Sequence, residues 1–371
     1  MTNTDDTKRA PHGAGGLSWL LGAALLAAVV VAAVHYTDQR AFFRLLRDAE
    51  PWWVAVAVLL QATTYLAQGG IWRRVASACG YPLGRGPAFD LSLAKLFADQ
   101  TIPSAGLSSS ILVAKALEQR QVPSPAVKAS VLVDIVSYHL AYAIALSAAL
   151  AIVVARGQSN VAIVIASVLV LAVCMGLSAG VLALVGRSRE RLAAAVQKIP
   201  AVRKVLEFVA GADPRLVRSP RVLAETIALQ ESIFLLDAAT VWFLILALGQ
   251  RASVTGVFAS FMVANLFRTM GVVPGGLGTF EATSVLTLRM VGVDVGLALS
   301  ATLLFRGLSF WLPMLPGYWL SRRALAEPRV RRGDAGPPRT VLSMPPRSAD
   351  ASSPMPTGRD VPQDQSGVHG R

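Results

Sequence analysis

Charged residues are scarce in this sequence, at 15% of 371 residues, whereas hydrophobic residues make up 54%. A soluble globular domain carries about 25% charged residues. The charge is missing from long blocks and concentrated between them, as expected when the bilayer is the solvent. The sequence therefore predicts an all-α integral membrane protein, built as a polytopic helical bundle.

Cysteine is almost absent as well. Cys79 and Cys174 are the two cysteines, and both lie in or beside apolar segments without metal-ligand spacing. We interpret them as buried, inert thiols. Neither a metal nor another cofactor is expected.

The common motifs of enzyme chemistry are missing too. There is no HExxH and no paired Cys/His metal set. The glycines at 275–278 are not followed by Lys-Ser/Thr, so they form no phosphate loop of the nucleotide-binding type. Glycosyl transfer by acidic residues in membrane helices would usually need a large exposed domain, and the longest predicted connection is only 187–221. We therefore predict that the protein is not an enzyme.

Basic residues dominate the charge that is present, with a net charge of +13. They lie in the connections between apolar blocks, where they orient a membrane protein and contact anionic head groups. No nucleic-acid-binding motif accompanies them, so nucleic acid is not an expected partner. The basic connections 71–87 and 187–221 and the basic tail place both termini in the cytoplasm, with the chain in the cytoplasmic (inner) membrane. Connection 35–51, which holds three Arg, argues weakly against this orientation.

Apolar blocks long enough to cross a bilayer recur along the chain. The first, residues 17–34, ends without the small-residue site of a cleaved signal peptide, so we interpret it as a spanning helix. Residues 40–50 resemble a short amphipathic helix in the interface. Further spans are predicted at 52–70, 126–155, 160–186, 222–248 and 295–320. Residues 1–16 and 322–371 lack hydrophobic periodicity and are expected to be disordered, which leaves 17–321 as the membrane domain.

Two segments are too interrupted to be ordinary spans. Residues 88–122 break at Pro103–Gly106, and residues 253–291 break at Val272–Gly278. Each is predicted to be a pair of short half-helices dipping into the membrane. The two copies share seven identities at an offset of 170. Because three predicted spans lie between them, they would enter from opposite faces as an inverted repeat, an arrangement found in secondary transporters.

The second break carries an unusual backbone. Pro274 lacks an N–H, and Gly275, Gly276 and Gly278 can adopt positive φ and let other groups approach closely. A helix beginning near Thr279 would present free N–H groups and the positive end of its dipole to an anion such as a lipid phosphate. The simpler alternative is a packing kink.

Two charged residues near this break suggest function. Glu281 could cap the new helix, pair with Arg306 or Arg268, or take a proton during transport. Arg306 lies in the middle of the last predicted span, where a charge is costly. It could form a structural ion pair or hold a phosphate, which the planar guanidinium suits.

Further polar residues fall inside predicted membrane segments. Asp134 lies in the third span, and Glu231 and Asp237 lie in the fifth. Asn265 and Arg268 precede the second break as Lys95 and Asp99 precede the first, and the two sets could line one polar cavity. His139 is expected to be a hydrogen-bonded residue of the bundle. The candidate lipid-binding or transport residues are Pro103, Gly106, Asp134, Glu231, Asp237, Asn265, Arg268, Pro274, Gly275, Gly276, Gly278, Glu281 and Arg306.

At VVPGGLGTFEATSVL the sequence resembles the transmembrane region of lysylphosphatidylglycerol synthases and related stand-alone flippase-like membrane proteins. The motif is Pro-Gly-Gly-Leu-Gly followed closely by Glu, here Pro274 to Glu281. A weaker Pro-x-x-Gly element occurs at Pro103 to Gly106, where Ser104 and Ala105 replace the usual glycines. The resemblance extends over roughly 15–325. It implies movement of a lipid between leaflets without the synthase domain that makes the lipid.

The resulting hypothesis is translocation of an anionic lipid or lipid-linked precursor between leaflets of the cytoplasmic membrane. Two alternatives stay open, an ion-coupled exporter of a small solute and a non-transporting membrane partner in envelope biosynthesis. The expected partners are membrane lipids, either an anionic phospholipid or a polyprenyl-phosphate-linked lipid. The sequence leaves open a homo-oligomer and contacts with envelope-biosynthesis enzymes.

Overall fold

A computed structural model describes residues 47–101, 107–158, 160–187, 200–270 and 274–326. Over these ranges the protein is all-helical, with no strand. Five helical segments are long and apolar enough to cross a membrane, so the chain is a multi-pass membrane protein. They are α3 (Pro51–Ala78), α6 (Ser124–Ala155), α7 (Val161–Leu184), α11 (Pro220–Ala247) and Val295–Arg323.

Proline starts three of the long helices. α3, α6 and α11 each have Pro at the first or second helical position, where its missing N–H costs no hydrogen bond and its fixed φ suits the helix. The predicted spans 126–155, 160–186 and 222–248 are thereby confirmed with small shifts at their ends. The predicted span 17–34 and most of the predicted interfacial helix, 40–46, lie outside the described residues.

Two helix ends differ from the prediction. Helix α3 continues to Ala78, so residues 71–78, which were predicted to be connection, are helical. The prediction failed because Arg73 and Arg74 interrupt the apolar run, yet Arg74 is held in place by a hydrogen bond to Glu225 of α11. The last span consists of α14 (Val295–Arg306), a π-helical turn η2 (Gly307–Trp311) and α15 (Leu312–Ala326). It therefore extends beyond residue 320.

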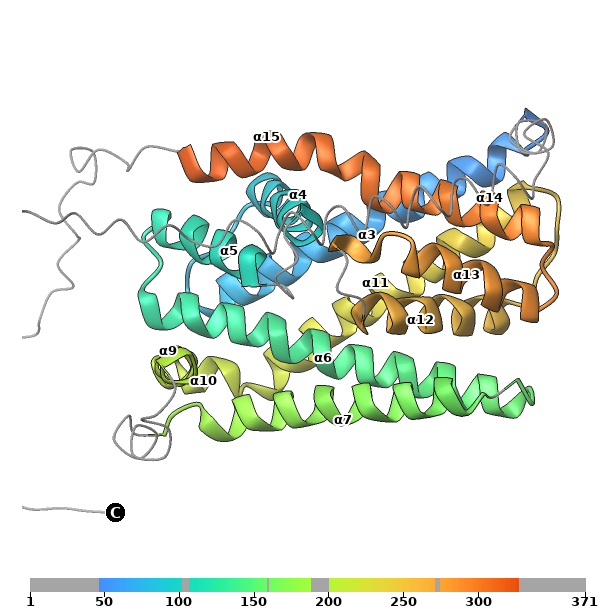
Figure 1. Cartoon of the computed structure of the whole chain (residues 1–371). Coiled ribbons are helices and arrows are strands. Elements are labelled where there is room, and N and C mark those ends of the chain that lie inside the picture. The colour runs from blue at the N-terminus through green and yellow to red at the C-terminus, as the bar shows by residue number, and fades with distance from the viewer. Residues whose placement is uncertain (1–46, 102–106, 159, 188–199, 271–273, 327–371) are drawn as a thin grey trace, which may run out of the picture. The chain divides into compact units, whose positions relative to one another are not determined.

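The two interrupted segments are pairs of short helices. The first pair is α4 (Arg85–Thr101) and α5 (Leu107–Gln119), and the second is α12 (Val254–Met270) and α13 (Thr279–Met290). A 3₁₀ turn, η1 (Pro274–Gly276), precedes α13. In Figure 1, α5 lies toward the end of the long helices that also holds α9 (Pro200–Ala210) and α10 (Pro214–Val217), whereas α12 and α13 lie toward the other end.

Three candidate spans, α6, α7 and α11, separate the two pairs along the chain. The prediction of an inverted repeat required three spans between the two interrupted segments, and the described residues contain three. The membrane depth of the short helices and the inversion itself stay predictions.

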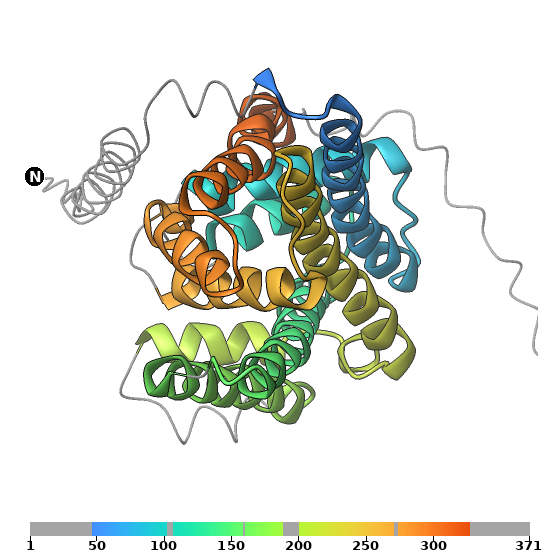
Figure 2. The ribbon, with the colours of Figure 1, turned by 90° about the vertical axis from the view of Figure 1, so that its right-hand side faces the viewer.

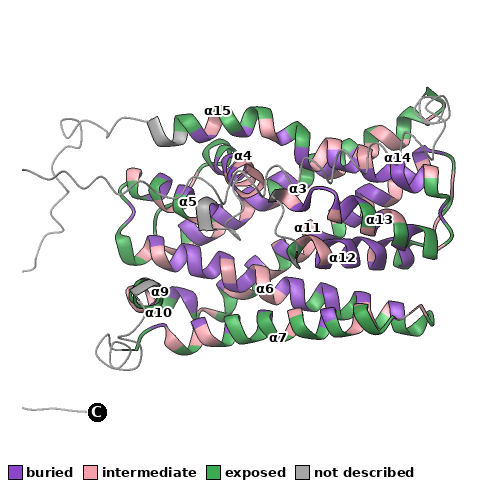
Figure 3. Cartoon of the chain, viewed as in Figure 1, coloured by how far each residue is buried: buried purple, intermediate pink, exposed green. Residues whose placement is uncertain are grey.

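The long helices pack in neighbouring pairs. Helix α3 packs against α11, and α6 packs against α7 (Figure 2). Helix α7 is mostly exposed along its outer side, whereas α6 beside it is largely buried (Figure 3). In a bilayer, the apolar exposed face of α7 would contact lipid, while the polar residues gather between the other helices.

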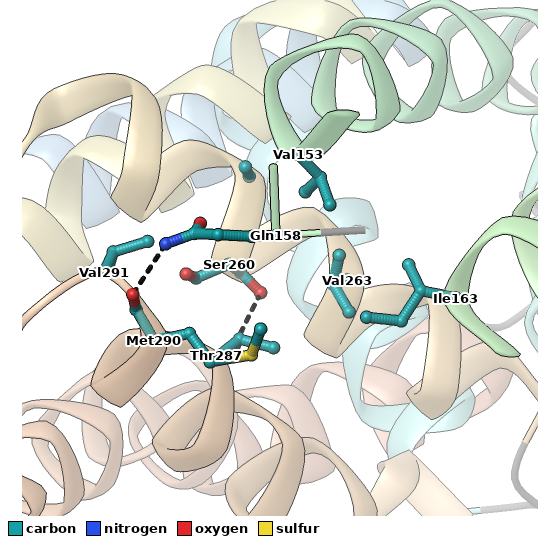
Figure 4. A pocket seen from close by; sticks show the side chains of 9 residues that line it. Val153, Gln158, Ile163, Ser260, Val263, Thr287, Met290 and Val291 are labelled. Atoms are coloured by element: carbon teal, nitrogen blue, oxygen red, sulfur yellow. Dashed lines mark hydrogen bonds between the residues drawn. The ribbon is translucent and has the colours of Figure 1, made fainter. Parts of the chain in front are cut away.

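A small apolar pocket lies where the α6–α7 link meets α12 and α13 (Figure 4). Val153, Ile163 and Val263 form part of its wall. The Nε2 atom of Gln158 donates to the carbonyl oxygen of Met290 at 2.7 Å. This hydrogen bond ties the α6–α7 link to the end of α13, so the pocket marks a packing contact between these elements.

Candidate functional site around the second helix break

The second break is a turn that only glycine tolerates. Gly275 and Gly276 have φ of 61° and 64°, in the left-handed region that favours glycine. A Cβ atom on Gly275 would collide with the ring of Phe310, and one on Gly276 would collide with the side chain of Arg268. The glycines thus let the backbone approach two side chains from other helices.

Glu281 caps the helix that follows the break. Its Oε2 atom accepts a hydrogen bond from the backbone N–H of Gly278 at 2.6 Å. The carboxylate also places negative charge in the first turn of α13, where the helix dipole stabilises it. The backbone N–H of Gly278 therefore already has a partner within the protein. It is not free for a lipid phosphate, as the sequence had suggested for the start of this helix.

Arg306 pairs with the same carboxylate. Its Nε atom lies 2.7 Å from Oε1 of Glu281, and its Nη2 atom donates to the carbonyl oxygen of Gly275 at 3.0 Å. The guanidinium also lies 4.4 Å from the ring centroid of Phe310. The side chains of Arg306 and Glu281 are only 6% and 1% exposed. Arg306 is thus a neutralised, hydrogen-bonded cation that fixes the break to α14.

A π-helical turn begins directly after Arg306, at Gly307. Such turns disturb the ordinary backbone hydrogen bonds and often lie at functional sites. Two side chains from other helices bind carbonyls of this turn. The Tyr65 hydroxyl of α3 donates to the carbonyl of Leu308, and Gln100 Nε2 of α4 donates to that of Ser309 at 3.2 Å. The turn therefore links the last span to both α3 and α4.

Arg268 differs from Arg306 because its charge is not paired. It lies in the last turn of α12, with its aliphatic stem against Gly276. Its Nε atom is buried without a hydrogen-bond partner, and within the described ranges no carboxylate forms an ion pair with it. The side chain is half-buried. Among the described residues, Arg268 is thus a cation beside the break without an ion-paired carboxylate.

Lys95 joins the first pair of short helices to α6. Its Nζ atom lies 3.2 Å from Oδ2 of Asp99 and 3.7 Å from Oδ2 of Asp134. Gln230 of α11 donates to Oδ1 of Asp134 at 3.3 Å. These four residues form a polar cluster across α4, α6 and α11. It holds Asp134 apart from the Arg306–Glu281 pair.

Three further candidate residues, Asp237, Asn265 and Glu231, have different surroundings. Asp237 accepts a hydrogen bond from Gln61 of α3 at 3.3 Å. Asn265 is buried and donates to the carbonyl of Phe261 within its own helix. Glu231 is half-buried, and its Oε1 atom has no partner among the described residues. Asp237 is thus bonded to α3 and Asn265 to its own helix, and the structure joins neither of them to the Arg306–Glu281 pair among the described residues.

His139 and Glu225 have structural partners. His139 Nδ1 lies 2.7 Å from the carbonyl oxygen of Ile135, which fits the predicted bundle residue. Glu225 forms ion pairs with both Arg74 and Arg221, so it ties α3 to α11.

The first break cannot be placed in the same way. Pro103 and Gly106 lie outside the described residues. Helix α4, which leads into this break, contacts η1 of the second. The two interrupted segments therefore meet in the described part of the chain.

Sequence reasoning overlooked a neutral polar face on α3. Gln61, Thr64, Gln68 and Trp72 recur at helical spacing and are all at least nine-tenths buried. We call this set the α3 neutral face. The residues carry no charge, so a search for charges inside apolar blocks missed them. The signal that could have found them is the spacing of polar side chains at i, i+3, i+7 within a predicted span.

Residues 19–317 match the family model described as the lysylphosphatidylglycerol synthase transmembrane region. The chain belongs to this family. Among similar curated proteins, the UPF0104 membrane protein PH1989 of Pyrococcus horikoshii is 33% identical over 103 residues, which are 28% of this chain and 31% of the relative. Phosphatidylglycerol lysyltransferase of Bacillus subtilis is 23% identical over 137 residues, or 37% of this chain and 16% of the relative. The matches therefore span less than a third of each relative, and the family resemblance stated from the motif is confirmed.

Proposed function

We propose that the protein moves an anionic lipid between the leaflets of the cytoplasmic membrane, with the lipid phosphate held by Arg268. The observation that carries this proposal is the buried Nε atom of Arg268 beside the second break, which has no hydrogen-bond partner in the described part of the chain. A charge inside a membrane protein is costly and is ordinarily paired or functional. Arg268 forms no ion pair among the described residues, so the phosphate of a ligand could supply the negative charge that pairs with its guanidinium.

Arg306 and Glu281 have a supporting role in this proposal. Their mutual pair and the hydrogen bonds to Gly275 and Gly278 hold the break in one conformation. Because Gly276 lies against the stem of Arg268, a fixed break also fixes the phosphate-binding cation. The two residues then position the site, and Arg268 contacts the ligand.

The family supports the lipid part of the proposal. The matched region is the transmembrane part of a synthase, and one relative is named phosphatidylglycerol lysyltransferase. For this chain we infer a non-enzymatic role in the cytoplasmic membrane, with both termini in the cytoplasm. The acyl chains would stay in the bilayer while the head group passes along the polar residues between helices.

The test is leaflet exchange in liposomes that contain the purified protein. A tail-labelled anionic phospholipid is quenched from outside, and the rate at which label becomes accessible is measured. We expect exchange above that of empty liposomes, and a loss of about tenfold or more in Arg268→Gln, because a charge-assisted contact contributes about 1.5–3 kcal/mol.

Arg289→Gln is the matched control. Arg289 lies on α13 near the break in sequence, but its side chain is exposed, so this variant keeps the wild-type rate. Equal rates for wild type and Arg268→Gln would remove Arg268 from the site. No exchange above empty liposomes would favour the solute-exporter or non-transporting reading.

A further inference from the structure

The α3 neutral face holds polar atoms that have no hydrogen-bond partner in the described part of the chain. The unpartnered atoms are Oε1 of Gln61, Nε2 of Gln68 and Nε1 of Trp72. The three side chains are 2%, 8% and 2% exposed. A buried polar group without a hydrogen bond costs about 1–3 kcal/mol. Three such groups on one helix face are more than a well-packed structural helix needs.

The face is joined to the second break through Tyr65, which lies between Gln61 and Gln68 on α3. Its hydroxyl donates to the carbonyl of Leu308 in η2, and the ring of Phe310 in the same turn lies against Gly275 of the break. From Gln61 the face runs along α3 to Trp72, a rise of about 16 Å at the α-helical spacing. This is about half the hydrocarbon thickness of a bilayer. The neutral face therefore leads into the part of the bundle where α3 packs against α4 and α11.

A partner for this face must both donate and accept hydrogen bonds. Gln61 offers an acceptor atom, whereas Gln68 and Trp72 offer donor atoms. On α4, Oε1 of Gln100 adds a further acceptor atom without a partner. A hydroxyl group satisfies both kinds of atom. An ammonium group only donates, and the three named residues of α3 carry no charge that would hold it.

We propose that the α3 neutral face binds the hydroxyl groups of the lipid head group, so that the substrate is an anionic phospholipid or glycolipid bearing a polyol. This inference rests on the proposed function, because Arg268 holds the phosphate while α3 binds the hydroxyls. The face is covered in this conformation, and the head group reaches it when α4 separates from α3.

The test compares two lipids that differ only in hydroxyl groups. Tail-labelled phosphatidylglycerol and phosphatidylpropanol have the same charge and a three-carbon head, but phosphatidylpropanol lacks the hydroxyls. In liposomes with the full-length protein, we expect wild type to exchange phosphatidylglycerol faster. In Gln68→Leu and in Trp72→Phe, the ratio of the two rates falls roughly threefold to tenfold, the effect of one lost neutral hydrogen bond.

Thr63→Val is the control on the same helix. Thr63 is exposed on another side of α3 and bonds only to its own helix, so the ratio keeps its wild-type value. Exchange of both lipids at one rate by wild type would overturn the inference and leave the proposed function standing. Equal slowing of both lipids in the two variants would also overturn it, because it would show a structural role or bound water only. If wild type exchanges neither lipid, the proposed function fails and this inference fails with it.

Discussion

The Nε atom of Arg306 lies 2.7 Å from Oε1 of Glu281, and these two side chains join α14 to the first turn of α13. Glu281 simultaneously caps α13 through Gly278, and Arg306 simultaneously bonds the carbonyl of Gly275. Three contacts thus converge on one carboxylate and one guanidinium. The pair is the element that keeps a non-helical turn in place among membrane helices.

Loss of one partner should destabilise the protein strongly. In Glu281→Gln, Arg306 keeps its buried charge without a counter-charge, which costs about 3–5 kcal/mol in other buried pairs. We expect a marked fall in the melting temperature of the detergent-solubilised protein. Thermal unfolding followed by a fluorescence assay measures it.

The double variant Glu281→Gln/Arg306→Met distinguishes charge imbalance from lost packing. Because it leaves no unpaired charge, it should melt above the single variant Glu281→Gln. A double variant that is less stable by the sum of the single effects would show that the two residues act independently.

Replacement of Gly276 should impair lipid exchange by more than the strain of its positive φ explains. In Gly276→Ala the new Cβ meets the side chain of Arg268, so we expect both a loss of stability and a loss of lipid exchange. Gly292→Ala is the matched control, since Gly292 also has a positive φ, 89°, but has open space around its Cβ position. The variant Gly292→Ala therefore has only the backbone strain, about 1–2 kcal/mol, and no clash with a neighbouring side chain. Equal exchange rates in the two variants would argue against a displaced Arg268.

The π-helical turn should depend on Tyr65. In Tyr65→Phe the carbonyl of Leu308 loses its donor from α3, and a buried acceptor without a partner costs about 1–3 kcal/mol. We expect a lower melting temperature in detergent, whereas Tyr81→Phe, at an exposed position, leaves it unchanged. Indistinguishable melting of both variants would mean that the turn is stable without this hydrogen bond.

Many of the long helices could be predicted from hydropathy alone. The block behind α7 carries no charged residue, and those behind α6 and α11 remain long and apolar enough to cross a bilayer despite the charges within them. The end of α3 could not be predicted, because a charged residue such as Arg74 is typical of a connection between spans. Only the structure shows that Arg74 pairs with Glu225 of α11. The same limit applies to Lys95, whose pairing with Asp134 depends on how α4 packs against α6.

The candidate site was only partly predictable. The glycine motif identified the break, and the pairing of Glu281 with Arg306 was among the alternatives drawn from the sequence. The spacing of the residues could not show which of the two arginines pairs with Glu281. The fold decides this by placing the guanidinium of Arg306 against that carboxylate. The α3 neutral face was missed because its residues carry no charge, and the search inside apolar blocks was a search for charged residues.

The Lys95 cluster should respond unequally to neutralisation of its members. In Lys95→Met, Asp99 and Asp134 both lose their counter-charge, whereas in Asp134→Asn the pair of Lys95 with Asp99 remains. We therefore expect Lys95→Met to lower the melting temperature more than Asp134→Asn. Thermal unfolding of both variants at neutral pH checks this order, and the reverse order would indicate that Asp134 has partners other than Lys95.

The central claim is that Arg268 binds the phosphate of a translocated anionic lipid. The most direct measurement is the ratio of exchange rates for anionic phosphatidylpropanol and zwitterionic phosphatidylcholine in liposomes, for wild type and for Arg268→Gln. The account predicts a wild-type preference for the anionic lipid that falls about tenfold or more in the variant, because the charge-assisted contact is lost. An unchanged ratio in the variant, or equal exchange of both lipids by wild type, would contradict it.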